Sequence, residues 1–143
     1  MEQNVETITL LLNQKEIAYE YDPKENILLF IMKNKYGDIF NILQFSETSI
    51  QFNAILSHKI EHIYDQTLTR LLPSENKDVK SGEFYMDSST NCLAFGSYNI
   101  ELNANKKQIS TFIDYIVDEV FPHFSHIYDL IMEKEAEESS ILF

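Results

Sequence analysis

Apolar residues in the first part of the chain recur at helical spacing. Over residues 4–14, Val5, Ile8, Leu11 and Leu12 fall three or four positions apart, or side by side on the same stripe. One face of an α-helix collects such positions, so the pattern predicts a short amphipathic helix.

Strand-like segments come next, separated by short polar turns. The first turn, residues 22–26, combines Pro23 with Asp and Asn, residues that favour tight turns. The segment 27–33 is apolar on both faces, which predicts a buried central strand. The segment 49–56 alternates apolar and polar residues, which predicts a strand with one wet face. The predicted strands of this region are residues 17–21, 27–33, 38–45 and 49–56.

A second amphipathic helix is predicted over residues 58–72. Ser57 is suited to cap its N-terminus, and Pro73 is expected to end it. A polar loop and another hairpin then follow, with predicted strands at residues 83–87 and 92–102.

The longest periodic pattern runs from about Asn105 to Ile131. Its apolar stripe keeps the 3.6-residue period on both sides of Pro122, so a continuous helix with a kink at the proline is predicted. Tyr115 and Phe121 widen the stripe beyond the width that a core face needs.

These elements predict an α+β domain with the order α-β-β-β-β-α-β-β-α. An antiparallel sheet would carry an N-terminal helix, a middle helix and a long C-terminal helix. Residues 1–133 are expected to form a single domain, and residues 134–143 an acidic, flexible tail. The closing Ile141-Leu142-Phe143 is expected to be either a docking peptide or a free end.

Charge narrows the classes of partner. The chain has 23 acidic residues against 11 basic ones and a formal net charge of -12. Such a field repels nucleic acids and anionic membranes, so neither is expected as a partner. The start of the chain lacks the pattern of a signal peptide, and Cys92 is the single cysteine. The cytoplasm is therefore the expected compartment.

Candidate catalytic and metal-binding residues are few. His58 and His62 lie four positions apart, but no third ligand has an informative spacing, so a solvated helix face is the favoured interpretation. His123 and His126 are interpreted in the same way. Cys92 is expected to pack as a small apolar residue. No catalytic, cofactor-binding or metal-binding residue is predicted, and the chain is not expected to be an enzyme.

The element order is similar to the fold shared by class I type III secretion chaperones and the YbjN family. Gly82-Glu83-Phe84-Tyr85-Met86-Asp87 resembles the G-x-F-x-x-D strand and turn of the YbjN family, and Val120-Phe121-Pro122 resembles its aromatic-proline step. The first hairpin fits more loosely, and residues 72–76 depart from the family pattern. The resemblance covers residues 3–132.

The resemblance implies a domain that binds proteins, sometimes as a dimer, with no enzyme activity and no cofactor. It also implies roles of the kind suggested for the YbjN family, in sensory regulation and stress. Our leading hypothesis is therefore a non-enzymatic protein-binding domain, chaperone-like or regulatory, with a client protein, a regulator partner or a second copy of the chain. The predicted partner-binding residues are Phe40, Ile42, Phe52, Ile55, Tyr115 and Phe121.

Two other functions fit the same sequence. The acidic surface suits an immunity-type inhibitor that neutralises a basic toxin. A small-ligand enzyme or sensor would need a polar pocket around His58 and His62 or around Cys92.

Overall fold

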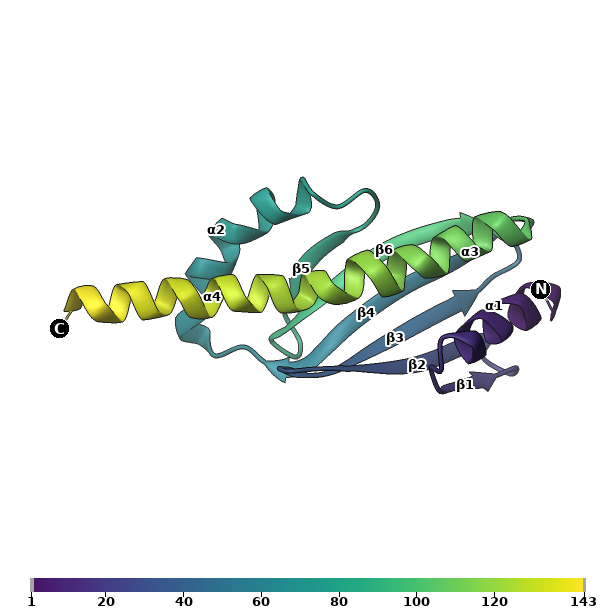
Figure 1. Ribbon diagram of the computed structural model, residues 1–143, viewed down its shortest axis with the longest axis horizontal. Coiled ribbons are helices and arrows are strands. Elements are labelled where there is room, and N and C mark those ends of the chain that lie inside the picture. The colour runs from purple at the N-terminus through teal and green to yellow at the C-terminus, as the bar shows by residue number, and fades with distance from the viewer. Residues whose placement is uncertain (1, 143) are drawn as a thin grey trace.

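The computed structural model describes the backbone of residues 2–142 and the side chains of residues 2–134. Helices and strands follow the predicted order (Figure 1). The helical elements are α1 (Glu2–Gln14), the 3-10 turn η1 (His62–Tyr64), α2 (Asp65–Asn76), α3 (Lys106–Tyr115), the π-helical segment η2 (Ile116–Val120) and α4 (Phe121–Leu142).

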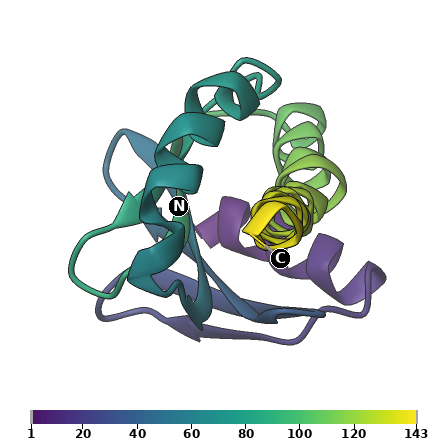
Figure 2. The ribbon, with the colours of Figure 1, turned by 90° about the vertical axis from the view of Figure 1, so that its left-hand side faces the viewer.

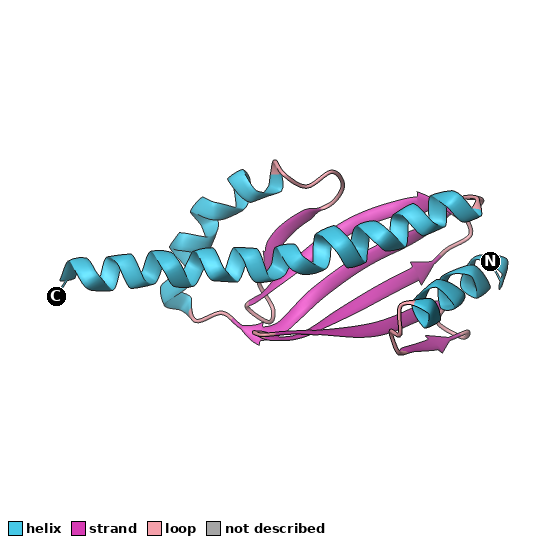
Figure 3. Ribbon diagram, viewed as in Figure 1, coloured by secondary structure: helices cyan, strands magenta, loops and turns pink. Residues whose placement is uncertain are grey.

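A six-stranded antiparallel sheet forms the other layer, with the strand order β1-β2-β3-β4-β6-β5 (Figure 3). Its strands are β1 (Tyr19–Asp22), β2 (Ile27–Asn34), β3 (Gly37–Phe45), β4 (Ser49–Lys59), β5 (Glu83–Asp87) and β6 (Cys92–Glu101). The predicted α+β fold is therefore confirmed.

The sheet curves around the long C-terminal helix, and the helices lie on its inner side (Figure 2). Alternate strand residues point inward, so Leu28, Leu43 and Phe52 are fully buried against the helices. One cluster of buried apolar side chains extends from Val5 in α1 to Ile131 in α4. This cluster ties the helical layer to the inner face of the sheet.

The long helix accommodates Pro122 by widening one turn. α3, η2 and α4 follow one another without a break, and together they extend for about 55 Å. Just before the proline, Phe121 donates its N–H to the carbonyl of Ile116, five residues back, in the π-helical pattern. Pro122 has no N–H to donate and its ring crowds the preceding turn. The continuous helix was predicted, and the widened turn is the form that its irregularity takes.

The middle helix differs from the prediction at both ends. β4 continues to Lys59, which pairs with Cys92, and Ile60 donates its N–H to the Asn91 carbonyl at 2.7 Å. This long-range pairing outweighs capping by Ser57, so α2 begins only at Asp65. α2 also continues past Pro73, which is exposed in the last turn and removes a single hydrogen bond there.

The predictions for β2 and for the C-terminal tail have different outcomes: the first needs correction, and the second falls partly outside the described residues. β2 is buried on its inner face only, and Ile31 on the other face is 42% exposed, because no helix or strand in the described part of the chain covers that side of the sheet. The predicted tail, residues 134–143, lies in the last turns of α4 as far as Leu142. Its side chains from residue 135 on, including Ile141-Leu142-Phe143, lie outside the described residues. Among helices of the described chain, none is long and apolar enough to cross a membrane.

The segment that resembles the G-x-F-x-x-D motif has a structural role. Gly82 has a φ of +78°, and a Cβ placed on it would lie 2.4 Å from the ring of Phe95. Phe84 is buried between Phe95 and the helix residue Phe124. The Asp87 carboxylate accepts hydrogen bonds from the hydroxyls of the following turn, which hold its pKa below the usual range. The motif therefore forms a turn, a core strand and a second turn.

Candidate functional site

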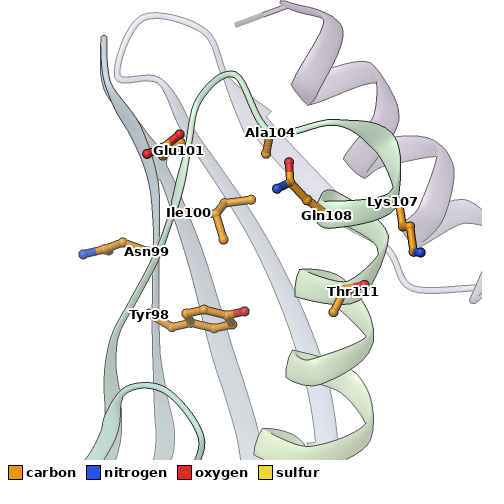
Figure 4. Close-up of a pocket in the computed structure, with 8 residues that line it drawn as sticks. All are labelled: Tyr98, Asn99, Ile100, Glu101, Ala104, Lys107, Gln108 and Thr111. Carbon is orange, nitrogen blue, oxygen red and sulfur yellow. The ribbon is translucent and has the colours of Figure 1, made fainter.

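A groove separates β6 from α3 at the end of the molecule where the two elements connect (Figure 4). Its cavity measures about 450 Å³. The rings and branches of Tyr98 and Ile100 point from β6 toward the helix, and Gln108 points back from α3. The lining residues are Tyr98, Asn99, Ile100, Glu101, Ala104, Lys107, Gln108 and Thr111.

The start of α3 holds one wall of this groove in place. Asn105 and Gln108 form a capping box, in which each side chain accepts a hydrogen bond of 2.8 Å from the other residue's backbone N–H. Such a box fixes the first helical turn immediately after β6. On the floor, the ring of Tyr98 packs edge-on against Phe112 and Tyr115, with centroid distances of 4.8 and 5.0 Å. Burial of its phenol raises the pKa of Tyr98.

A second cavity of about 420 Å³ continues the groove along α3 and shares Tyr98 and Thr111 with the first. The predicted partner-binding residue Tyr115 lines this part. Its hydroxyl donates to the Ser81 carbonyl at 3.0 Å and accepts from the Ser81 N–H at 3.2 Å. Burial, the largest cause, raises the pKa of Tyr115. Tyr115 thus attaches the loop before β5 to α3 and closes this end of the groove.

The edge of β6 beside the groove carries no neighbouring strand. β5 has five residues and pairs only with residues 92–96 of the ten-residue β6. Within the described chain, no strand lies beside Ser97–Glu101 on the side away from β4. Leu102 donates its N–H toward β4, to the Thr48 carbonyl at 3.1 Å. Because N–H groups alternate in direction along a strand, those of Asn99 and Glu101 point to the open edge.

The outer face of the sheet is a second open surface. Strand register places Ile31, Phe40, Ile55, Ala94 and Tyr85 side by side across β2, β3, β4, β6 and β5. Leu29 and Ile42 pair with each other in the neighbouring row. We call these seven residues the outer stripe. Its ends are the most accessible, since Ile31 is 42% and Tyr85 40% exposed.

The structure divides the predicted partner-binding residues among four places. Phe40, Ile42 and Ile55 lie together on the outer stripe. Phe52 was predicted to join them, but it faces the opposite side of β4 and is fully buried, so it is a core residue. Successive strand residues point to opposite faces of the sheet, which explains the correction. Phe52 points to the inner face, as Ile50 and Ala54 do, whereas Ile55 points to the outer face. Tyr115 lies in the groove, and Phe121 is half-buried at the margin of the core.

Carboxylates dominate the charged groups around the outer stripe. Glu20 pairs directly with Leu29, and Glu83 flanks Tyr85 on the same face of β5. The charged strand residues with outward parity are the acids Glu20, Asp22, Asp38, Glu83, Asp87 and Glu101 and the bases Lys33 and Lys59. The outer face therefore combines an apolar centre with a mainly acidic surround.

The histidines take part in side-chain contacts within the fold. His62 opens η1 and lies 3.0 Å from the Asp65 carboxylate, while His58 belongs to β4, so the two do not share a helix as predicted. His123 and His126 both approach one Glu75 carboxylate oxygen, at 3.0 and 3.4 Å. These contacts join α4 to α2.

Metal ligands and nucleophiles form no recognisable constellation in the described part of the chain. No group of three or more His, Cys, Asp or Glu side chains there could hold a metal ion. The Cys92 thiol is buried and contacts the Thr90 carbonyl at 3.6 Å. Neither surface described above brings a nucleophile next to a base.

Comparisons with known proteins identify the fold. No protein-family model matches the chain, and no curated protein sequence matches it. The structure is similar to the crystal structure of YbjN from E. coli, a proposed transcription regulator, with a TM-score of 0.53 and 12% sequence identity. The match covers 94% of this chain and 93% of that one. The chain therefore has a YbjN-like fold, as its sequence motifs predicted.

The groove and the open edge of β6 were not predicted from the sequence. One signal for the edge was present, because the two predicted strands of the last hairpin differ in length. A longer strand must extend beyond its partner. The groove has no comparable signal, since Tyr98 and Thr111 meet only through the packing of α3 on the sheet.

Proposed function

We propose that the chain is a cytoplasmic, non-catalytic protein-binding domain that takes up an extended segment of its partner along the open edge of β6. The observation that carries the proposal is the unpaired stretch Ser97–Glu101, which lies directly beside the groove. Backbone N–H and C=O groups on such an edge form hydrogen bonds readily with an added strand.

The groove supports this mode of binding by offering space for side chains. Alternate residues of an added strand would point toward the α3 side, where Tyr98 and Ile100 provide an apolar floor. The residues between them would point away from α3. The expected partner segment is therefore extended and carries apolar residues at every second position.

Electrostatics favours a protein segment with basic residues. Asp114, Asp118 and Glu119 line the second cavity, where Lys15 pairs with Asp114 at 2.9 Å and Lys80 with Glu119 at 3.6 Å, so the acidic residues are in excess. Together with the net charge of -12, these carboxylates attract basic partners and repel nucleic acids. A regulator that works through protein contacts, or a chaperone-like escort, fits these properties. YbjN, which shares the fold, is itself a proposed regulator.

Selection from a random peptide library tests the proposal. Peptides selected on the wild-type domain are expected to bind the Asn99→Ala variant, which keeps the backbone N–H that points to the open edge. The Asn99→Pro variant lacks that N–H, yet its change leaves the ladder with β4 intact, so binding is expected to fall at least about tenfold.

Circular dichroism of both variants controls for folding. A selected peptide should also show strand-type chemical shifts in the bound state. If no peptide is enriched, or if enriched peptides bind Asn99→Pro as tightly as Asn99→Ala, strand addition at this edge is wrong.

A further inference from the structure

The outer stripe is an apolar row whose two ends are exposed and whose centre is half-buried, apart from Ala94, which is 2% exposed. Its central row crosses five strands, from Ile31 in β2 to Tyr85 in β5, through directly paired residues. Four strand spacings make this row about 19 Å long. All helices of the described chain lie on the other side of the sheet (Figure 2). A surface of this kind is typical of a site that binds another protein.

The direction of the stripe restricts the shape of its occupant. The row runs across the strands, and at Phe40, Ile55 and Ala94 both neighbouring strands already pair with the backbone. An isolated strand lying on this face would therefore leave its own backbone polar groups unpaired. A helix satisfies its own backbone and presents an apolar ridge at i, i+3/i+4 and i+7. A ridge of about 19 Å corresponds to roughly 13 helical residues.

The acidic residues around the outer stripe indicate which charge the partner helix carries. A second copy of this chain would bring its own acidic surround against Glu20, Asp22 and Glu83, and each copy has a net charge of -12. Like charges that face each other across an interface disfavour association. A helix flanked by lysine or arginine would instead place cations opposite these carboxylates.

We propose that the outer stripe binds a basic amphipathic helix of a partner protein. The helix lies across the strands, with its apolar ridge over Phe40 and Ile55 and its basic flanks toward the surrounding carboxylates. This surface is on the opposite side of the sheet from the helices, away from the groove, so the proposal does not depend on strand addition at β6.

Binding of designed peptides tests the proposal. The probe is a fluorescein-labelled peptide of about 14 leucine and lysine residues with helical periodicity, measured by fluorescence anisotropy. Two comparison peptides have the same length: one replaces lysine by glutamate, and the other alternates leucine and lysine with strand periodicity. The expected order of affinity places the helical leucine-lysine peptide first, and its affinity should weaken between about 50 and 300 mM NaCl.

Variants locate the binding surface. Ile31→Lys with Tyr85→Lys adds charge at both ends of the outer stripe, on side chains exposed enough to tolerate it. The matched control, Leu10→Lys with Ile63→Lys, adds the same charge at apolar residues that are 58% and 69% exposed elsewhere. The stripe variant should lose at least about tenfold in affinity for the helical peptide relative to the control variant.

Four results would overturn the proposal. Equal loss in the stripe and control variants would show that the peptide senses net charge alone. If the strand-periodic peptide binds as tightly as the helical leucine-lysine peptide, a helical partner is not required. If the glutamate peptide binds as tightly, basic flanks are not required. A dimer in sedimentation experiments that dissociates in the stripe variant, but not in the control variant, would assign the surface to a second copy of the chain.

Discussion

Replacing Gly82 with alanine tests the account of the turn that leads into β5. The glycine has a φ of +78°, a conformation that costs a residue with a side chain about 1–2 kcal/mol. The new Cβ would also lie 2.4 Å from Cζ and 2.9 Å from Cε1 of the Phe95 ring. Such contacts require the ring or the backbone to move, and overpacking of this kind typically costs about 1–3 kcal/mol.

The two contributions together predict that Gly82→Ala lowers the free energy of unfolding by about 2–5 kcal/mol. That is a large fraction of the roughly 5–15 kcal/mol expected for a domain. Urea unfolding followed by circular dichroism measures the change, and an unaltered m-value would show that the transition remains comparable. Ser81→Ala provides a control one residue away.

A double-mutant cycle with Phe95→Leu separates the steric contribution from the conformational one. Leucine removes the far edge of the ring, so Gly82→Ala should cost about 1–2 kcal/mol less in that background than in the wild type. A cost of Gly82→Ala below about 0.5 kcal/mol would refute the reasoning as a whole. A substantial cost with no coupling to Phe95 would refute the steric part.

Three further changes probe the fold by related measurements. Tyr128→Phe removes a buried hydroxyl that donates to a β4 carbonyl at 2.8 Å, so thermal or urea unfolding should show a loss of about 1–2 kcal/mol, and no loss would contradict the bond. The Asn76 amide forms hydrogen bonds with both the N–H and the carbonyl of Phe84, at 2.6 and 2.9 Å. Asn76→Leu should therefore lower the free energy of unfolding by about 2–3 kcal/mol. A loss smaller than that of one hydrogen bond would argue against this pairing. Hydrogen bonds from Lys35 and then Tyr36 hold the pKa of Asp129 below its usual range, so this carboxylate stabilises the fold above its unfolded pKa of about 3.9 and loses that effect as pH falls through the folded pKa. The stability difference between the wild type and Asp129→Asn should therefore be present at pH 7 and shrink below about pH 4, and a difference independent of pH would contradict the assignment.

Local pattern was sufficient to predict most of the fold. The strand at residues 83–87 coincides with β5, and the strand at 49–56 begins where β4 begins, because alternation and turn residues mark these boundaries directly. The start of α2 could not be predicted in this way. Pairing of Lys59 with Cys92 extends β4 at the expense of the helix, and that contact joins residues far apart in the chain.

The candidate surfaces were predicted only in part, for the same reason. Apolar residues on both faces of residues 27–33 predicted burial of both faces, whereas in the structure only the inner face of β2 is buried. Phe40 and Phe52 are alike in type, and only their parity relative to the helices separates a surface residue from a core residue. The groove depends on where α3 packs, which no local pattern specifies.

Amide hydrogen exchange tests the central claim, strand addition at β6, most directly. The measurement follows the N–H groups of Asn99 and Glu101 in the free domain and with a saturating library-selected peptide. We predict fast exchange of both in the free domain and marked protection in the complex, with the N–H groups of Tyr98 and Ile100, which point toward β4, protected in both states. Protection of Asn99 and Glu101 already in the free domain, or no change when a peptide binds, would contradict the claim.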